Sequence, residues 1–291
     1  MKIPSVLEDK VDNVLNWCKG KRCVLAFSGG VDSTILGRIL VEAYNLSLLE
    51  MPPIGFYANS PTSTSNDVLE VRHVADEIRL SLVVLESGEF NEPLFLKNSS
   101  ERCYWCKRWR FSEIMQKAQQ ICEPQYRNQI VLVDGSNADD SLDYRPGTKA
   151  AKELGVFSPL AEFGFSKKEI RALASCLELS VANKPSTPCL ATRLAYNLTI
   201  SEDRLRKVER AEQIIKEYTG GKGRARMDAP DSIRIELPEE HIELFTTPKI
   251  RCCIVPKLRE LGFNFISLDL EGFISGKYNR MLNSSNNLLK T

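Results

Sequence analysis

The 291-residue sequence lacks a long apolar run, an excess of charge of either sign and a histidine cluster. No apolar run approaches the roughly 20 residues of a membrane span. The polar N-terminus is not expected to be a signal peptide. The net charge of +1 gives no electrostatic footprint for a long nucleic acid. Its two histidines, His73 and His241, are interpreted as surface or core residues. We expect a cytoplasmic protein, in which local basic clusters could still hold a small phosphorylated ligand.

Nine cysteines without a secretion signal indicate reduced thiols or metal ligands rather than disulfides. Cys103 and Cys106 are three residues apart and can face one metal or cluster. Such a pair alone also fits redox thiols or half a zinc site. Cys189, in a turn stiffened by proline, adds a third sulfur, and three thiolates suit a [4Fe–4S] cluster with one open iron. The other six are predicted to be packing residues: Cys18, Cys23, Cys122, Cys176, Cys252 and Cys253.

The segment 24–34, VLAFSGGVDST, predicts a strand, a tight turn and a helix N-terminus. Paired glycines at Gly29 and Gly30 let the backbone approach a bulky anion. Exposed N–H groups and the helix dipole then favour phosphate, and Ser28 and Ser33 add hydroxyl groups. Asp32 implies a divalent cation, Mg²⁺, that bridges it to the phosphates. The turn has no lysine, so it is not a Walker A loop. The alternative is an ordinary glycine turn in a βα unit.

Strands rich in valine, isoleucine and leucine alternate with helical patterns, which predicts an α/β fold with a parallel sheet covered on both faces. Strands are expected at 22–27, 54–58, 82–85 and 130–133, and helices at 9–17, 33–44 and 66–80. Ser166 starts another helix, with Glu169 at the capping-box position. Ligands bind beyond the carboxyl ends of such strands, which places 28–33, Ala58 with its successors, and 134–137 along one rim.

The second half changes character, and we predict two domains, 1–190 and 191–291. The second is expected to be a small α+β domain for substrate binding and oligomerisation. Its expected elements are a helix over 201–218, a strand over 233–237, helices from 238 and over 248–261, and a strand over 263–270. The polar tail 283–291 is expected to be loosely ordered.

Four polar clusters accompany these elements. Asp134 and Gly135 open the segment 134–140, followed by 143–147, DYRPG; this acidic loop holds magnesium, orients a substrate or is simply solvated. The segment 188–193, PCLATR, combines a thiol, a hydroxyl and a guanidinium. Arg224 and Arg226 stand at strand spacing, so both point to one face and can bind phosphate, or form a solvated strand. The segment 269–272, DLEG, ends the last expected strand.

Together these motifs resemble the LarE family, PP-loop (adenine nucleotide alpha hydrolase-like) sulfur transferases of nickel-pincer nucleotide biosynthesis. The matching blocks are 27–33, 102–107, 134–147, 188–193 and 269–272. The first block marks only the superfamily of ATP pyrophosphatases. The resemblance implies that ATP adenylylates a carboxylate of pyridinium-3,5-biscarboxylic acid mononucleotide, and that sulfur then displaces AMP to leave a thiocarboxylate. One departure is Arg280, where an acidic residue is expected.

The resemblance also implies residue roles. Asp32 and Cys189 are the expected catalytic residues, and the substrate phosphate is held by Thr192, Arg193, Arg224 and Arg226, with Trp109 near the substrate ring. ATP is expected to contact Ser28, Gly29, Gly30, Asp32, Ser33, Ala58, Asp134 and Gly135. Some members sacrifice the sulfur of one cysteine at the position of Cys189, which becomes dehydroalanine. Others bind a [4Fe–4S] cluster through three cysteines, here Cys103, Cys106 and Cys189, and this chain matches that type, with a separate sulfide donor.

Two other functions stay open. A PP-loop tRNA thiolase also carries three cluster cysteines, but it should have an extended basic face, which the near-neutral charge does not favour. A non-catalytic, ATP-binding iron–sulfur sensor would not need the arginines at 193, 224 and 226. The sequence leaves the oligomeric state, the sulfide donor and the metal on the thiolates open.

Overall fold

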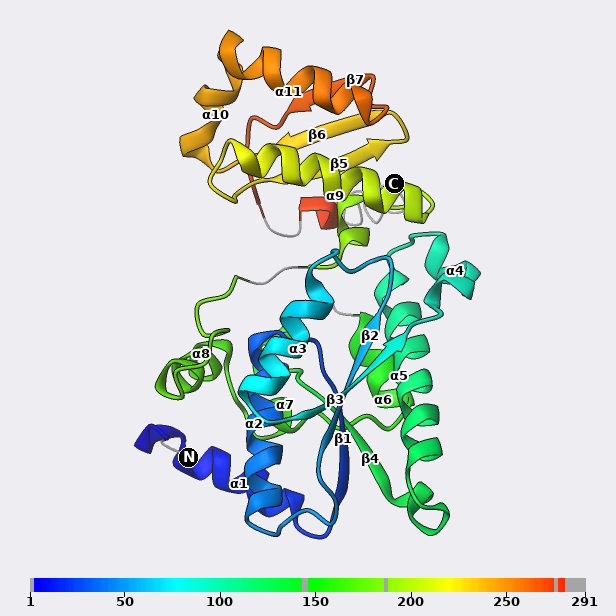
Figure 1. Ribbon diagram of the computed structural model, residues 1–291, viewed down its shortest axis with the longest axis vertical. Helices are drawn as coiled ribbons and strands as arrows, with labels where there is room; N and C mark the ends of the chain where they lie inside the picture. Colours follow the sequence, from blue (N-terminus) through cyan, green and yellow to red (C-terminus); the bar gives the residue numbers. More distant parts are fainter. Residues whose placement is uncertain (1–2, 143–145, 186–187, 275–276, 281–291) are drawn as a thin grey trace, which may run out of the picture. The chain divides into compact units, whose positions relative to one another are not determined.

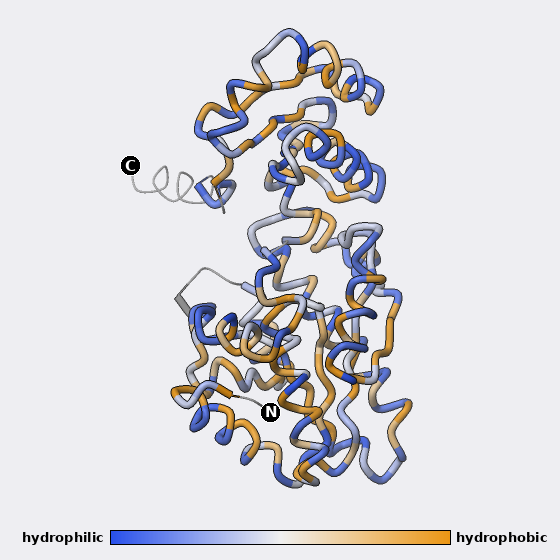
Figure 2. The backbone as a smooth tube through the Cα atoms, turned by 60° about the vertical axis from the view of Figure 1, so that its left-hand side comes forward, coloured by the Kyte–Doolittle hydropathy of each residue, from blue (hydrophilic) through white to orange (hydrophobic). Residues whose placement is uncertain are grey.

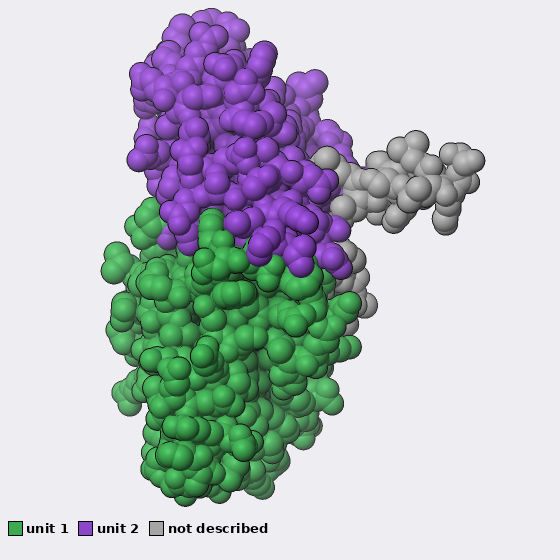
Figure 3. Space-filling view, turned by 90° about the vertical axis from the view of Figure 1, so that its right-hand side faces the viewer, with its two compact units in different colours: residues 1–60, 65–92, 103–187 green, residues 61–64, 93–102, 188–291 purple. Residues whose placement is uncertain are grey.

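The computed structural model describes residues 3–142, 146–185, 188–274 and 277–280. The chain divides into two compact units, coloured in Figure 3. Unit 1 comprises residues 1–60, 65–92 and 103–187, and unit 2 comprises residues 61–64, 93–102 and 188–291. Unit 2 therefore contains two short segments from the N-terminal half, which a single boundary at 190 would assign elsewhere.

Unit 1 is built on a four-stranded parallel sheet with the order β3-β2-β1-β4 (Figure 1). The strands are β1 (Arg22–Ala26), β2 (Ile54–Asn59), β3 (Ser81–Glu86) and β4 (Ile130–Asp134). In the register, Val24 of β1 stands beside Ile54 of β2 and Leu132 of β4. The expected parallel sheet is confirmed.

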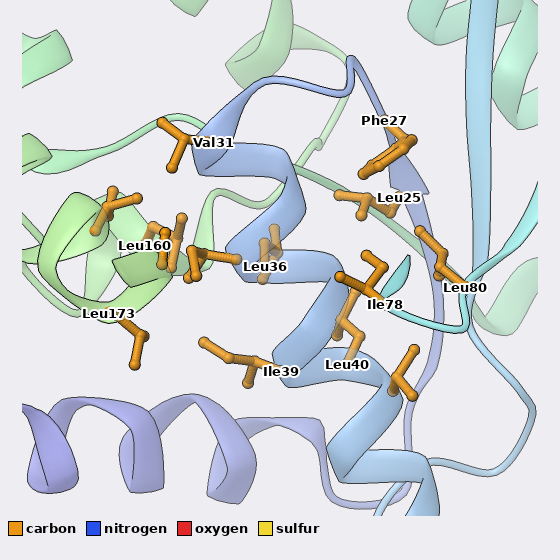
Figure 4. Close-up of a cluster of buried hydrophobic side chains, with 14 of the residues drawn as sticks. Leu25, Phe27, Val31, Leu36, Ile39, Leu40, Ile78, Leu80, Leu160 and Leu173 are labelled. Atoms are coloured by element: carbon orange, nitrogen blue, oxygen red, sulfur yellow. The ribbon is translucent and has the colours of Figure 1, made fainter. Parts of the chain in front are cut away.

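Successive strand residues point to opposite faces of this sheet, and helices cover both faces. Leu25 and Phe27 belong to a core with α1 (Glu8–Cys18), α2 (Val31–Asn45), α3 (Asp67–Glu77), α7 (Pro159–Glu162) and α8 (Lys167–Cys176). Figure 4 shows this core, with Leu36 and Leu40 of α2 among its side chains. Val24 and Phe56 belong to a second core with α5 (Arg102–Ile121) and α6 (Pro146–Glu153). The sheet is therefore buried on both faces, as predicted.

The 20-residue helix α5 was not among the expected helices, although its cysteines were singled out. Phe111, Ile114 and Ala118 recur at helical spacing and pack against β1, β2 and β4. Helix α3 ends at Glu77 rather than at the expected Leu80, because Arg79 takes a φ of +58°. Short 3₁₀ turns complete unit 1: η1 (Ser5–Leu7), η2 (Glu89–Asn91), η3 (Pro124–Gln129) and η4 (Ala138–Leu142).

Unit 2 contains a three-stranded mixed sheet, β5-β6-β7, and three main helices. Strands β5 (Arg224–Ala229) and β6 (Ser232–Glu236) are antiparallel, and β7 (Phe265–Leu268) runs parallel to β6. The helices are α9 (Glu202–Glu217), α10 (Glu239–Thr246) and α11 (Pro248–Glu260), with α4 (Pro93–Leu96) and the turns η5 (Leu190–Arg193) and η6 (Lys277–Asn279). Helix α9 packs on β5.

The segment 93–102 is an integral part of unit 2. Asn98 is fully buried, and its Nδ2 donates to the carbonyl oxygens of Ala195 at 2.8 Å and Leu198 at 3.0 Å. Arg102 donates to Asn98 Oδ1 at 2.6 Å and to the carbonyl of Ala191 at 3.0 Å.

Polar and apolar residues follow one another in short stretches along the tube of Figure 2. In the parts of the chain that the structure describes, no helix is both long and apolar enough to cross a membrane.

Candidate functional site

The loop between β1 and α2 is fixed by its own side chains. Gly29 has a φ of +68°, which glycine adopts without strain. The hydroxyls of Ser28 and Ser33 are 3.0 Å apart, and Ser33 Oγ donates to the carbonyl of Gly30 at 3.1 Å. The backbone N–H of Gly30 donates to Ser28 Oγ at 3.3 Å. The turn thus precedes the N-terminus of the 15-residue helix α2, a polarity that favours anions.

The loop after β4 lies directly against this turn. A Cβ atom on Gly135 would stand 2.7 Å from the backbone nitrogen and 2.9 Å from the Cα atom of Ser33. Because both are backbone atoms, only glycine permits this approach. The structure therefore brings together the two segments, 28–33 and 134–135, that the sequence placed on one rim.

These segments line a pocket of about 270 Å³ in unit 1. Six of the predicted nucleotide residues lie on its wall: Ser28, Asp32, Ser33, Ala58, Asp134 and Gly135. Gly29 and Gly30 belong to the adjoining turn. The rest of the wall is Ala26, Phe27, Phe56, Tyr57, Lys107, Arg110, Phe111, Ile114, Ser136 and Asp140.

Asp134 is an almost fully buried carboxylate at the end of β4. It accepts hydrogen bonds from Ser158 Oγ at 2.6 Å and Ser136 Oγ at 2.8 Å, and Lys107 Nζ lies 3.2 Å away. Burial alone would raise the pKa of Asp134, but Lys107 and the two serines together hold it below its ordinary value. The carboxylate is therefore anionic at neutral pH and fixed in position.

Asp32, the predicted magnesium ligand, forms an ion pair with Lys167 at the start of α8. Asn137 Nδ2 lies 3.4 Å from its other carboxylate oxygen. The backbone N–H of Lys167 donates to Asp139 Oδ2 at 2.8 Å, which joins η4 to α8. The carboxylate of Asp32 is an oxygen ligand of the type that Mg²⁺ prefers, and in this structure Lys167 occupies one of its two oxygens.

Sequence reasoning missed three cations beside this pocket: Lys107, Arg110 and Lys167. Lys107, Arg110, Phe111 and Ile114 are spaced to share one face of α5, and all four line the pocket. Their helical spacing was a readable signal, but α5 had not been identified as a helix. Lys167 follows Ser166, the N-cap of α8, whose predicted capping box with Glu169 is present.

The three proposed cluster cysteines are all accessible, but they belong to both units. Cys103 is exposed and Cys106 partly exposed, one turn apart at the start of α5 in unit 1. Cys189 is exposed in unit 2, where it is the N-cap residue of η5. Within the described residues, no three histidine, cysteine, aspartate or glutamate side chains gather closely enough to hold a metal ion. The donor type suits a cluster, and a shared site for these thiolates stays a prediction.

The other six cysteines form three pairs that differ in exposure. Cys18 and Cys23 are buried as predicted, and burial raises the pKa of Cys18 to about 12. Cys122 and Cys176 are partly buried. The prediction of packing residues is wrong for Cys252 and Cys253, which are exposed because α11 turns Ile254 and Leu258 inward instead.

Arg193 is 1% exposed, and its hydrogen bonds go to its own unit. Nε donates to Glu212 at 2.7 Å, and Nη1 donates to the carbonyl of Pro188 at 2.7 Å and to Thr192 Oγ1 at 2.9 Å. Thr192 Oγ1 in turn donates to the carbonyl of Cys189 at 2.7 Å. In this arrangement Arg193 and Thr192 fix the turn that carries Cys189.

The side chain of Arg226 also has its ion-pair and hydrogen-bond partners within unit 2, whereas Arg224 has fewer partners. Arg226 is buried, pairs with Glu236 at 2.9 Å and donates to the carbonyl of Thr192 at 2.8 Å. Half-buried Arg224 donates to the carbonyl of Gly223 at 3.1 Å and forms no ion pair with a described carboxylate. Burial, followed by the charge of Arg193, lowers the pKa of Arg224. This guanidinium is thus the cation of the three best placed to take an anionic ligand.

The remaining predicted residues have varied surroundings. Trp109 is half-buried on α5, and its Nε1–H has no hydrogen-bond partner among the described residues. Asp269 pairs with Lys277 at 2.7 Å, and Arg280, the departure noted above, pairs with Glu271 at 2.6 Å. Residues 143–145 of the acidic segment, 186–187 before Pro188 and the tail 281–291 lie outside the described residues.

Comparison with models of known protein families gives no match. The chain is 34% identical over 278 residues to the uncharacterized protein slr1717 of Synechocystis, which covers 95% of this chain and 99% of that protein. It is 31% identical to the uncharacterized protein MJ0830 of Methanocaldococcus jannaschii, over 89% of this chain and 94% of the relative. It is 29% identical to the pyridinium-3,5-bisthiocarboxylic acid mononucleotide synthase of Lactiplantibacillus plantarum, over 90% of each chain. The similarity therefore extends through both units.

Proposed function

We propose that this chain, which belongs to the same family as the uncharacterized proteins slr1717 and MJ0830, is an ATP-dependent sulfur transferase that converts a carboxylate of a pyridinium mononucleotide into a thiocarboxylate. The relative whose name states a product is a synthase of a pyridinium bisthiocarboxylic acid mononucleotide, which supports this substrate class. The observation that carries the proposal is the pocket of unit 1, where a glycine turn at a helix N-terminus adjoins fixed carboxylates.

The activation step is assigned to unit 1. A carboxylate resists attack by sulfur because hydroxide is a poor leaving group, and transfer of the adenylyl group of ATP supplies a better one. The departing pyrophosphate is assigned to the turn at the N-terminus of α2, where Ser28, Gly30 and Ser33 are hydrogen-bonded to one another in this structure. Asp32 would hold Mg²⁺, which neutralises phosphate charge when bound. Lys107, fixed by Asp134, adds positive charge on the same wall.

Binding of the substrate phosphate is assigned to unit 2. Arg224 offers its guanidinium to the phosphate of the mononucleotide, because a guanidinium can donate two parallel hydrogen bonds to phosphate oxygens. Arg226, Arg193 and Thr192 support this surface through Glu236, Glu212 and the Cys189 turn. Trp109, in unit 1, carries the indole proposed to lie near the substrate ring.

Sulfur delivery is assigned to Cys103, Cys106 and Cys189. Their thiolates would hold a [4Fe–4S] cluster, whose open iron supplies a bound sulfide from a separate donor. The competing route uses Cys189 alone as the sulfur source and converts it to dehydroalanine. An iron–sulfur sensor would use the same thiolates without turnover.

The first experiment tests nucleotide chemistry. Wild-type protein with ATP, Mg²⁺ and the pyridinium biscarboxylic acid mononucleotide should release AMP and pyrophosphate in equal amounts, measured by anion-exchange chromatography. Asp32→Ala should abolish this release while the far-ultraviolet circular dichroism spectrum is unchanged. ADP and phosphate as the wild-type products would contradict the proposal.

The second experiment separates the sulfur sources. Cys103→Ser should lose sulfur transfer and the broad visible absorption of an anaerobically purified cluster protein, yet still form AMP. Cys252→Ser, an exposed cysteine on α11, is the matched control and should behave as wild type. Intact-mass measurement after turnover decides the rest, since dehydroalanine at Cys189 of the wild type would replace the cluster route by the sacrificial one.

The third experiment tests the substrate class. Arg224→Ala should weaken binding of the pyridinium mononucleotide. Lys222→Ala should not, because Lys222, which stands two residues before Arg224, is exposed and pairs with Glu240. Tight, salt-sensitive binding of tRNA by the wild type would instead indicate a thiolase.

A further inference from the structure

Glu89 is a fully buried carboxylate whose charge is poorly compensated. It begins η2, just after β3, and is 0% exposed. Its Oε1 accepts from Arg110 Nη2 at 2.6 Å, and its Oε2 has no hydrogen-bond partner in the described parts of the chain. A buried ion that is only partly satisfied destabilises a fold. A contribution to stability therefore does not explain why a glutamate stands at this buried position. Its effect on its ion-pair partner, Arg110, offers another explanation.

Arg110 is held against the end of β2 on the wall of the nucleotide pocket. The same Nη2 that pairs with Glu89 donates to Ser60 Oγ at 2.8 Å, one residue beyond β2. Arg110 lines the pocket together with Lys107 and Phe111 from the same face of α5. Two partners at one nitrogen fix a corner of the guanidinium, so little conformational entropy is lost when it binds a ligand.

The residues that line the pocket form a polar set and an apolar set, which we call its polar wall and its apolar wall, and we expect this difference to orient a nucleotide. The polar wall consists of the turn at Ser28–Ser33 with Asp134–Ser136, at the ends of β1 and β4. The apolar wall consists of Phe27, Phe56, Ala58, Phe111 and Ile114. Pyrophosphate suits the first wall and a purine base the second. The α-phosphate, which joins the two parts of ATP, then lies between them.

The two cations that α5 contributes to this pocket, Lys107 and Arg110, have different ion-pair and hydrogen-bond partners. Lys107 is paired with the buried Asp134 beside the polar wall. Arg110 is held near β2, whose residues Phe56 and Ala58 belong to the apolar wall. Arg110 is thus held closer to the apolar wall than Lys107 is, on the side of the polar wall where the α-phosphate joins the nucleoside.

We propose that Glu89 positions Arg110 to bind the α-phosphate of the nucleotide, the phosphorus at which adenylyl transfer occurs. The inference rests on the proposed function and adds a residue pair to it. A guanidinium stabilises the negative charge that builds on the α-phosphate oxygens during transfer. Glu89 is a positioning residue, because it acts through Arg110 and does not reach the pocket itself.

The test compares two ligands that share no phosphate of ATP. AMP carries the α-phosphate, and inorganic pyrophosphate stands for the other two. Isothermal titration calorimetry with the full chain and Mg²⁺ should show Glu89→Gln binding AMP about tenfold more weakly than wild type, with pyrophosphate affinity unchanged. Glu86→Gln is the matched control, because Glu86 is exposed and bonded to Asn59 at 3.1 Å; it should bind both ligands as wild type does.

Arg110→Lys provides a second variant that keeps a positive charge beside Glu89 and loses the planar donor fork. It should lower AMP affinity and the rate of AMP formation and leave pyrophosphate binding intact. Equal loss of both ligands in either variant, or no loss of AMP affinity, would overturn the inference. Failure of the wild type to bind AMP and pyrophosphate would instead refute the proposed function, so the two failures are distinguishable.

Discussion

Replacing Arg193 by alanine should strongly destabilise unit 2. The side chains of Arg193 and Glu212 are 2% and 5% exposed, and their 2.7 Å ion pair lies between η5 and α9. Without Arg193, the Glu212 carboxylate keeps contacts with Lys216 at 3.5 Å and the N–H of Ala225 at 3.4 Å. Both are long, and removal of one partner from a buried ion pair costs about 3–5 kcal/mol. The free energy of unfolding should fall by an amount in that range.

The pH dependence of this loss has a definite sign. Burial alone would raise the pKa of Glu212, but Arg193 outweighs it and the pKa lies below its ordinary value. In the wild type, the stability from Glu212 is present above its unfolded pKa and is lost as pH falls through the folded pKa. In Arg193→Ala, the main interaction that offsets the effect of burial on Glu212 is absent, so the pKa of Glu212 in the folded state rises. Stability is then lost as the pH rises through that pKa. The variant should therefore be more destabilised at about pH 8 than at about pH 5.

Urea denaturation followed by two signals measures this loss. All three tryptophans, Trp17, Trp105 and Trp109, are in unit 1, so their fluorescence reports that unit, whereas far-ultraviolet circular dichroism reports both. Lys222→Ala is the control, because its pair with Glu240 is more than half exposed and is expected to contribute less than about 1 kcal/mol. A loss below about 1 kcal/mol for Arg193→Ala, or one that does not change with pH, would refute the reasoning.

Three further predictions concern unit 1. Gly135→Ala should abolish nucleotide binding, measured by calorimetry, because the new Cβ would stand 2.7 Å from the backbone nitrogen of Ser33. The pKa of Glu169 is lowered to about 2, mainly by a hydrogen bond from Lys10. The stability that this interaction contributes is therefore present at neutral pH and is lost as the pH falls from about 4.5. Lys10→Met should accordingly cost about 0.5–1 kcal/mol near pH 7 in urea denaturation, and almost nothing near pH 2, because both groups are partly exposed. Cys18, whose pKa burial raises to about 12, should react with a thiol reagent only at the rate of unfolding, followed by mass spectrometry.

The sheet of unit 1 was predictable because its signal is local. Runs of valine, isoleucine and leucine between turn residues define each strand, and helical patterns between them require parallel pairing. The glycine turn at 28–30 and its neighbour at Gly135 could be placed on one rim for the same reason. Their close approach, at Ser33, is a property of three-dimensional packing that no local pattern specifies.

Helix α5 and the partner of Arg193 show what the sequence could not specify. The inward face of α5 mixes Lys107, Arg110 and Phe111, so its helical period is hidden from a search for apolar residues. Arg193 has the chemistry of a phosphate ligand, but Glu212, 19 residues later on α9, takes its Nε–H. Such a pairing depends on tertiary structure, and the same holds for the exposure of Cys252.

The division of unit 2 among separate stretches of chain has a consequence for dissection of the gene. A fragment that starts at 188 lacks residues 93–102. It therefore also lacks the side-chain amide of Asn98, which donates hydrogen bonds to the backbone carbonyls of Ala195 and Leu198. Truncation near residue 190 would therefore yield an aggregation-prone half rather than a portable module. Recombination between relatives would be tolerated only where the 93–102 and 188–198 stretches are inherited together, so their sequences should change in concert.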